Sequence, residues 1–127
     1  MSDITDTTSC AYAQTIIDTA AQRLGIDRLN AMQKAAIAAC CNGGEVILEA
    51  PTGSGKTLAY LIPLAAHLST DRPDVQALVI LPTRELARQV DSVARAISTG
   101  FKIACCHGGH PFKDEAASLS GHPALVI

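Results

Sequence analysis

The stretch APTGSGKT at residues 50–57 decides the fold of this chain of 127 residues. A short apolar run at residues 46–48 precedes it and predicts a buried strand, and the apolar segment 58–68 that follows predicts a buried helix. Gly53 and Gly55 allow the connecting turn to take backbone conformations that other residues avoid. A strand, a glycine-rich turn and a helix in this order are typical of a loop that surrounds a phosphate with backbone N–H groups.

The loop carries the side chains that a nucleoside triphosphate and magnesium require. We expect Lys56 to place its ammonium on the outer phosphates and Thr57 to ligate Mg²⁺ through its hydroxyl. Both are also candidate catalytic residues, and the expected nucleotide contacts are Thr52, Gly53, Ser54, Gly55, Lys56 and Thr57. A small-residue connection without a ligand is the alternative, but the complete match between a strand and a helix favours nucleotide binding. The loop alone does not choose between kinases, GTPases, transport ATPases and helicases.

Strand and helix patterns alternate along the rest of the chain. After the loop, apolar runs predict strands over residues 75–81, 101–106 and 124–127, with helices over 84–98 and 114–119. Before it, helices are predicted from Thr8 or Ser9 to Gly25 and over residues 30–41. This alternation predicts an α/β fold, in which a parallel sheet has helices on both faces and binds ligands at the carboxyl ends of its strands. We expect an N-terminal helical region at residues 1–45 and a sheet-containing domain at 46–127, packed as one compact unit over residues 10–127.

The composition excludes several classes of protein. The chain is 48% hydrophobic and 17% charged, as expected of a globular domain, and its formal net charge of −2 excludes a strongly basic nucleic-acid arm. Its polar, acidic N-terminus does not resemble a secretory signal, and no run of about 18 apolar residues predicts a membrane span. The five cysteines include two adjacent pairs, a spacing found in neither redox motifs nor zinc knuckles. We therefore expect reduced thiols, a cytoplasmic protein and no membrane partner.

Two further motifs stand at the carboxyl ends of predicted strands. In LPTRELA at residues 81–87, a turn at Pro82 and Thr83 exposes helix N-terminal amides beside the guanidinium of Arg84, and together these can hold a nucleic-acid phosphate. A simple helix cap at Thr83 with a solvated Arg84 is the alternative. In HGGH at residues 107–110, Gly108 and Gly109 either let a sugar-phosphate approach the backbone closely or only form a turn.

Three other patterns in this part of the chain have simpler explanations. Cys105, Cys106, His107 and His110 are residue types that bind zinc, but strand alternation would direct the two cysteines and His107 to different faces. Arg88, Asp91 and Arg95 are three and four residues apart, which predicts a row of surface ion pairs. The acidic stretch at residues 114–117 predicts a first helical turn and not a magnesium site.

Taken together, the motifs resemble those of DEAD-box RNA helicases. The family's phosphate loop is similar to residues 50–57 with Ala50 in first place, its motif Ia resembles residues 82–87, and its double glycine resembles Gly108 and Gly109. Gln33, eight positions after Gly25, resembles the Q motif with which this family reads adenine, although Ile26 stands where the family has an aromatic residue. An amide both donates and accepts, which suits the adenine edge. A solvated helix glutamine is the alternative for Gln33.

The resemblance covers residues 12–127 and implies a P-loop NTPase (RecA-like) three-layer sandwich that is incomplete in this chain. It implies the ATP-binding N-terminal lobe of an ATP-dependent RNA helicase, with ATP and magnesium as cofactors. Single-stranded RNA, contacted through its backbone, and a second RecA-like lobe would be its partners. Because the Asp-Glu-Ala-Asp motif is absent, we expect a fragment that binds nucleotide weakly and hydrolyses essentially none. A DNA helicase or translocase lobe and a non-catalytic nucleotide-binding module are the rival interpretations.

Overall fold

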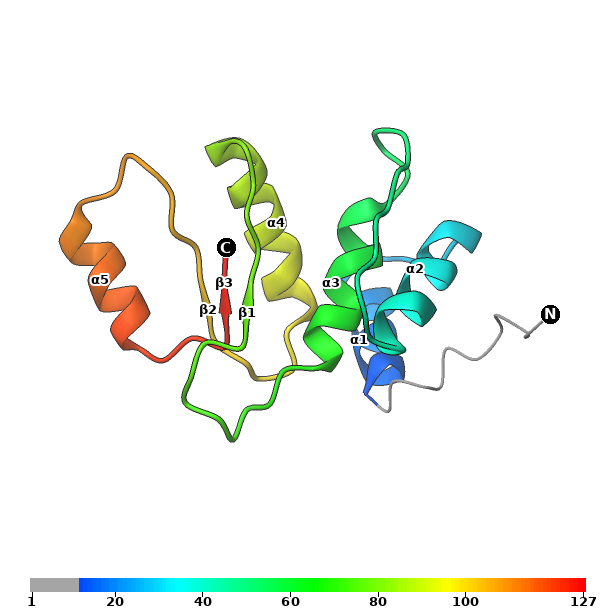
Figure 1. The fold of residues 1–127 in the computed structure, drawn as a ribbon, viewed down its shortest axis with the longest axis horizontal. Coiled ribbons are helices and arrows are strands. Elements are labelled where there is room, and N and C mark those ends of the chain that lie inside the picture. Colours follow the sequence, from blue (N-terminus) through cyan, green and yellow to red (C-terminus); the bar gives the residue numbers. More distant parts are fainter. Residues whose placement is uncertain (1–11) are drawn as a thin grey trace. The chain divides into compact units, whose positions relative to one another are not determined.

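The computed structural model describes residues 12–127, in two compact units that divide between His67 and Leu68. The first unit contains the helices α1 (Ala13–Leu24), α2 (Ala31–Cys41) and α3 (Lys56–Ala66). The second contains β1 (Ala77–Leu78), α4 (Arg84–Ile97), β2 (Ile103–Ala104), α5 (Phe112–Ser120) and β3 (Leu125–Val126) (Figure 1). The expected boundary between residues 45 and 46 falls inside the first unit, and that division of the chain stays a prediction.

The helices of the first unit begin and end where local sequence signals predict. Gly25 ends α1 in the left-handed conformation, with φ 65°, and its N–H bonds to the carbonyl of Ala21. Asn30 begins α2 through a capping box with Gln33, in which each side chain accepts from the other residue's backbone N–H. The predicted cap at Thr8 or Ser9 lies outside the described residues. Helix α3 packs against both α1 and α2, and their fully buried side chains include Ile16, Ile37, Leu61 and Ile62.

The strand predicted before the phosphate loop does not form. Residues 46–48 have no regular secondary structure, and the side chain of Ile47 is 93% exposed. A strand needs a neighbour to satisfy its backbone N–H and C=O groups, and all the strands among the described residues belong to the second unit. The prediction of a buried strand here is therefore wrong, because apolar composition alone does not supply that partner.

The second unit is a three-stranded parallel sheet in the order β1-β3-β2. Leu125 in the central strand pairs with Ala77 on one side and with Ile103 on the other, and it is almost fully buried. The strands predicted over residues 75–81, 101–106 and 124–127 are confirmed in place, although each is only two residues long. The helices α4 and α5 flank the sheet, and both contact β2 (Figure 1).

Helix α4 covers the sheet with an apolar face. Ala87, Val90, Ala94 and Ile97 recur at helical spacing and are all buried. Helix α5 begins at Phe112, two residues earlier than predicted, and has no buried residue. Asp114 and Glu115 lie in its first turn, as the sequence predicted. Across the described residues, no helix is both long enough and apolar enough to cross a membrane.

Candidate functional site

The predicted phosphate loop is a tight turn closed by its own hydrogen bonds. Gly53 and Gly55 have φ of 81° and 89°, in the left-handed region that favours glycine. The carbonyl of Pro51 accepts from both the amide and the hydroxyl of Ser54, at 3.2 and 2.6 Å. The ammonium of Lys56 donates to the carbonyl of Ala50, which ties the two ends of the loop together. The loop therefore holds its curved shape through contacts within residues 50–57.

The start of α3 suits an anion. Gly55 is the N-cap of this helix, and no side chain of the described residues caps it. The starts of α2 and α4 are capped by Asn30 and Thr83, while α1 and α5 have no side-chain cap. The first amides of a helix carry partial positive charge and need acceptors, so the start of α3 fits a phosphate group. Next to Lys56, the hydroxyl of Thr57 is an oxygen donor of the kind that magnesium accepts.

Gln33 is joined directly to this loop. Its side-chain Nε2 donates to the carbonyl of Gly55 at 3.2 Å, and its Oε1 accepts from the backbone N–H of Asn30 at 2.9 Å. The side-chain Nδ2 of Asn30 in turn donates to the carbonyl of Ser54 at 3.0 Å. Gln33 is only 6% exposed, so it is not a solvated helix residue. The structure brings the predicted adenine-reading residue and the phosphate loop together, while the adenine contact itself stays a prediction.

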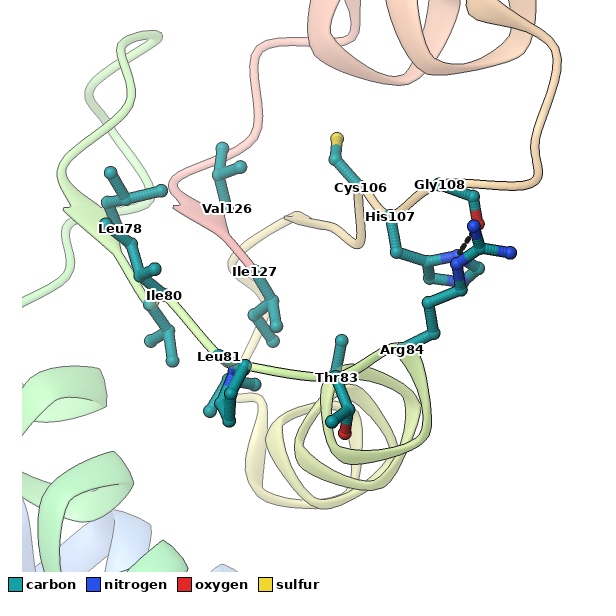
Figure 2. Close-up of a pocket in the computed structure, with 13 residues that line it drawn as sticks. Leu78, Ile80, Leu81, Thr83, Arg84, Cys106, His107, Gly108, Val126 and Ile127 are labelled. Atoms are coloured by element: carbon teal, nitrogen blue, oxygen red, sulfur yellow. Dashed lines mark hydrogen bonds between the residues drawn. The ribbon is translucent and has the colours of Figure 1, made fainter.

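A second candidate site lies at the carboxyl ends of the three strands. It is a pocket of about 360 Å³. In Figure 2 the residues that line it lie between α4, in yellow-green, and α5, in orange. Its lining residues come from β1 and the segment after it, from the start of α4, from the segment after β2 and from the end of β3: Leu78, Val79, Ile80, Leu81, Pro82, Thr83, Arg84, Ala87, Cys106, His107, Gly108, Val126 and Ile127. Carboxyl ends of parallel strands are where open α/β sheets bind ligands.

Arg84 lies against the glycine pair. A Cβ atom added to Gly108 would come within 2.9 Å of Arg84 Nη2, and one added to Gly109 would come within 2.9 Å of Arg84 Nη1. Gly109 also has φ 98°, in the left-handed region. Figure 2 shows the Arg84 side chain pointing toward Gly108 and His107. Two motifs that the sequence predicted separately therefore form one surface, on which the glycines leave room for the guanidinium.

Thr83 has a structural role at the same place. Its hydroxyl accepts from the amide of Leu86 at 3.2 Å, so the helix-cap alternative is confirmed for this residue. Pro82 precedes it and is exposed. Arg84 and Glu85 are exposed residues of the first helical turn, but Arg84 is not merely solvated, because it packs on the glycine pair.

His107, which the sequence suggested only as a zinc ligand, is fixed by three contacts. Its backbone N–H donates to Glu115 Oε1 at 3.0 Å, its Nδ1 lies 3.0 Å from the carbonyl of Gly108, and its Nε2 accepts from Arg88 Nε at 3.4 Å. Of the predicted ion-pair row, Arg95 and Asp91 form the expected pair at 2.9 Å, whereas Arg88 reaches His107. The sequence offered one signal for the position of Arg88. It is four residues after Arg84, and this spacing places both side chains on one face of a helix.

Three cysteines of the described residues are less acidic than a free thiol. Burial raises the pKa of Cys40, Cys105 and Cys106, and the carboxylate of Asp91 also raises the pKa of Cys105. Within residues 12–127, no group of three or more His, Cys, Asp or Glu side chains could hold a metal ion.

Comparison with known proteins places these features in a family. Residues 30–127 match the model of the DEAD/DEAH box helicase family. The DEAD-box ATP-dependent RNA helicase CshC of Bacillus cereus is 35% identical over 116 residues, which cover 90% of this chain and 30% of that protein. The ATP-dependent rRNA helicase RRP3 of Encephalitozoon cuniculi is 37% identical, over 84% of this chain and 27% of its own length. The chain therefore spans about 30% of these curated relatives.

Solved structures give the same result for the fold. The RNA helicase Prp28 from Chaetomium thermophilum, crystallised with ADP, has a TM-score of 0.78 at 25% identity, over 100% of this chain and 39% of that one. A hypothetical ATP-dependent RNA helicase from Sulfolobus tokodaii has a TM-score of 0.75 at 33% identity, over 89% of this chain and 33% of that one. The fold is thus the RecA-like α/β fold expected from the sequence. With its phosphate loop, its glycine pair beside Arg84 and a family match over most of its length, this chain belongs to the DEAD/DEAH box helicase family.

Proposed function

We propose that this chain is the ATP-binding N-terminal lobe of an ATP-dependent RNA helicase, in which ATP hydrolysis drives unwinding or remodelling of RNA. The observation that carries the proposal is the loop at residues 50–57, where the uncapped start of α3 lies beside the Lys56 ammonium and is joined to Gln33. The names of the curated relatives, which are ATP-dependent RNA helicases, support the same activity. A cytoplasmic location is part of the proposal, and the cysteine spacing, which favours reduced thiols, supports it.

Each loop residue has a role in holding the nucleotide. The Lys56 ammonium leaves the Ala50 carbonyl and binds the outer phosphates, whose negative charge makes them the stronger acceptor. The backbone of residues 52–57 surrounds the phosphates, and the Thr57 hydroxyl ligates magnesium, which would supply charge neutralisation during phosphoryl transfer. Gln33 reads adenine with its side-chain amide, which both donates and accepts.

The strand-end pocket holds the RNA. Arg84 binds a backbone phosphate, with the turn at Pro82 and Thr83 beside it, and Gly108 and Gly109 leave the chain close to the sugar-phosphate. Contacts of this kind go to the nucleic-acid backbone, so they give affinity without reading sequence. In the full-length protein, a second RecA-like lobe completes the ATP site.

Nucleotide binding tests the first half of the proposal. ATP binding to this chain is measured by calorimetric titration with magnesium, for the wild type and for Lys56→Ala. Removing a charged donor from a phosphate weakens binding roughly tenfold or more. Lys113→Ala, on the exposed surface of α5, is the matched control and leaves the affinity unchanged. An ATP affinity that is the same in Lys56→Ala as in the wild type rules out the role given to this loop.

Unwinding assays with the full-length gene product test the second half. We expect ATP-dependent unwinding of RNA duplexes that is reduced in Arg84→Ala. Unwinding of DNA duplexes alone would favour a DNA helicase or translocase. ATP binding without hydrolysis or unwinding of either duplex would favour a non-catalytic nucleotide-binding module.

A further inference from the structure

Two histidine rings lie together beside the glycine pair. His107 and His110 flank Gly108 and Gly109, and the turn between them brings their ring centroids to 4.2 Å with an interplanar angle of 51°. Gly109, at φ 98°, provides the backbone reversal that this contact requires. The proposed backbone contacts of Arg84, Gly108 and Gly109 do not use either ring.

His107 is a rigid support. Its backbone and both ring nitrogens have partners, from Glu115 on α5, from Gly108 and from Arg88 on α4. One tautomer satisfies both ring contacts: Nδ1–H donates to the Gly108 carbonyl and Nε2 accepts from the Arg88 guanidinium. The ring is thus held in one orientation by Gly108 and by Arg88 on α4, while Glu115 on α5 holds the backbone.

His110 is the outer ring of the pair. It is exposed, whereas His107 is half-buried, so one side of the His110 ring packs on the support and the rest faces solvent. Consecutive Cα atoms are about 3.8 Å apart. His110 directly follows Gly109, so its ring starts one residue beyond the backbone on which we place the sugar-phosphate. From there the ring is within reach of the base of the same nucleotide.

We infer that His110, supported by His107, stacks against a base of single-stranded RNA whose phosphate lies on Arg84 and the glycine pair. This inference rests on the proposed RNA-binding function and adds a base contact to it. Flat side chains stack on unpaired bases, histidine included, and such stacking tolerates any sequence because every base has a π-face. The surface is basic as well as flat, since the guanidinium groups of Arg84 and Arg88 lie beside the turn.

The test pairs a change in the protein with a change in the RNA. Binding of a fluorescent oligouridine to the full-length gene product is compared with binding of strands in which one abasic nucleotide is moved along the sequence. We expect one abasic position to weaken binding by the wild type roughly fivefold or more. His110→Ala weakens binding of the intact strand by a similar factor, and that abasic position then has no further effect, because the two changes remove the same contact. His110→Tyr, which keeps a flat ring, restores the affinity.

Controls separate this inference from the function on which it rests. His122→Asn changes a histidine before the amino end of β3, where φ 55° is tolerated by asparagine, and leaves RNA binding unchanged. RNA binding that is lost in Arg84→Ala but unchanged in His110→Ala keeps the proposed function and defeats base stacking. Base stacking also fails if His110→Ala retains the full abasic penalty at every position. A wild type that binds no RNA overturns both.

Discussion

The side-chain Nε2 of Gln33 donates a hydrogen bond to the carbonyl oxygen of Gly55 at 3.2 Å, and it leaves no room for a side chain at Gly55. A Cβ atom on Gly55 would come within 2.4 Å of this nitrogen. One contact thus ties the start of α2 to the residue that begins α3. A change at Gln33 or at Gly55 should therefore alter the position of the other residue.

Replacing Gln33 should cost stability as well as nucleotide binding. Gln33→Ala leaves the backbone N–H of Asn30 and the carbonyl of Gly55 without their part-buried partner, which costs about 1 kcal/mol. Urea unfolding measures this loss, and Gln89→Ala, at an exposed position of α4, serves as the control with little change. An unfolding free energy equal to the wild type would show that the two contacts contribute nothing.

A charge at the same position gives a pH-dependent form of this prediction. Gln33→Glu keeps the acceptor for Asn30 but points a carboxylate at the Gly55 carbonyl oxygen. The protonated carboxyl can donate again, so the folded state favours the protonated form. The stability that this carboxyl contributes is then present below its unfolded pKa and is lost as pH rises through its folded pKa. Unfolding free energies of Gln33→Glu at acidic and neutral pH check this prediction. A variant that is more stable at neutral pH than at acidic pH would show that the carboxylate has a favourable partner.

Gly55→Ala should destabilise the protein more than Gly53→Ala. Both glycines have left-handed φ, which costs an alanine about 1–2 kcal/mol. Only at Gly55 does the new methyl also meet Gln33, because nothing lies within 4 Å of a Cβ on Gly53. In the Gln33→Ala background the clash disappears, so the cost of Gly55→Ala should fall toward that of Gly53→Ala. Strictly additive costs in urea unfolding would contradict this coupling.

Gly108 and Gly109 should respond differently to the same substitution. Alanine at Gly108 meets only the flexible end of Arg84, so Gly108→Ala should keep its stability while RNA binding falls as far as in Arg84→Ala. Gly109→Ala adds backbone strain of about 1–2 kcal/mol at φ 98°. Gly100→Ala, strained at φ 112° but remote from the pocket lining, is the control that loses stability and keeps RNA binding. If Gly108→Ala weakened RNA binding further in the Arg84→Ala background, the two would act separately.

The cysteines after β2 should react slowly with alkylating agents. Burial raises the pKa of Cys105 and Cys106, so at a given pH the folded protein has less reactive thiolate than the unfolded chain. Because the pKa of each thiol is raised on folding, the protonated thiols contribute stability at pH values below their unfolded pKa. This contribution is lost as pH rises through their folded pKa. Mass spectrometry after iodoacetamide treatment at several pH values, with and without urea, checks this. Faster alkylation of the folded protein would refute it.

Local signals in the sequence were sufficient for the helices. Gly25 and Asn30 mark helix ends through their own backbone preferences and side-chain bonds, and both are where the sequence placed them. Local signals were not sufficient for residues 46–48. Their apolar side chains predict burial, but strand formation depends on a partner strand, which no local pattern specifies.

The candidate site was predicted in parts. The sequence identified the loop at residues 50–57, Arg84 and the glycine pair, because each carries a recognisable combination of residues. The packing of Arg84 on Gly108 and Gly109 depends on β1 and β2 ending at the same edge of the sheet, so only the structure shows it. The bond from Arg88 to His107 was missed for the same reason.

The uncapped start of α3 has a consequence for how the chain moves. The side chains of Asn30 and Thr83 cap the starts of α2 and α4, whereas no described side chain caps the start of α3. Amide hydrogens at Lys56, Thr57 and Leu58 should therefore exchange with solvent faster than those at the starts of the other two helices. Bound ATP should slow this exchange, so the rate at these three positions reports nucleotide occupancy without any label.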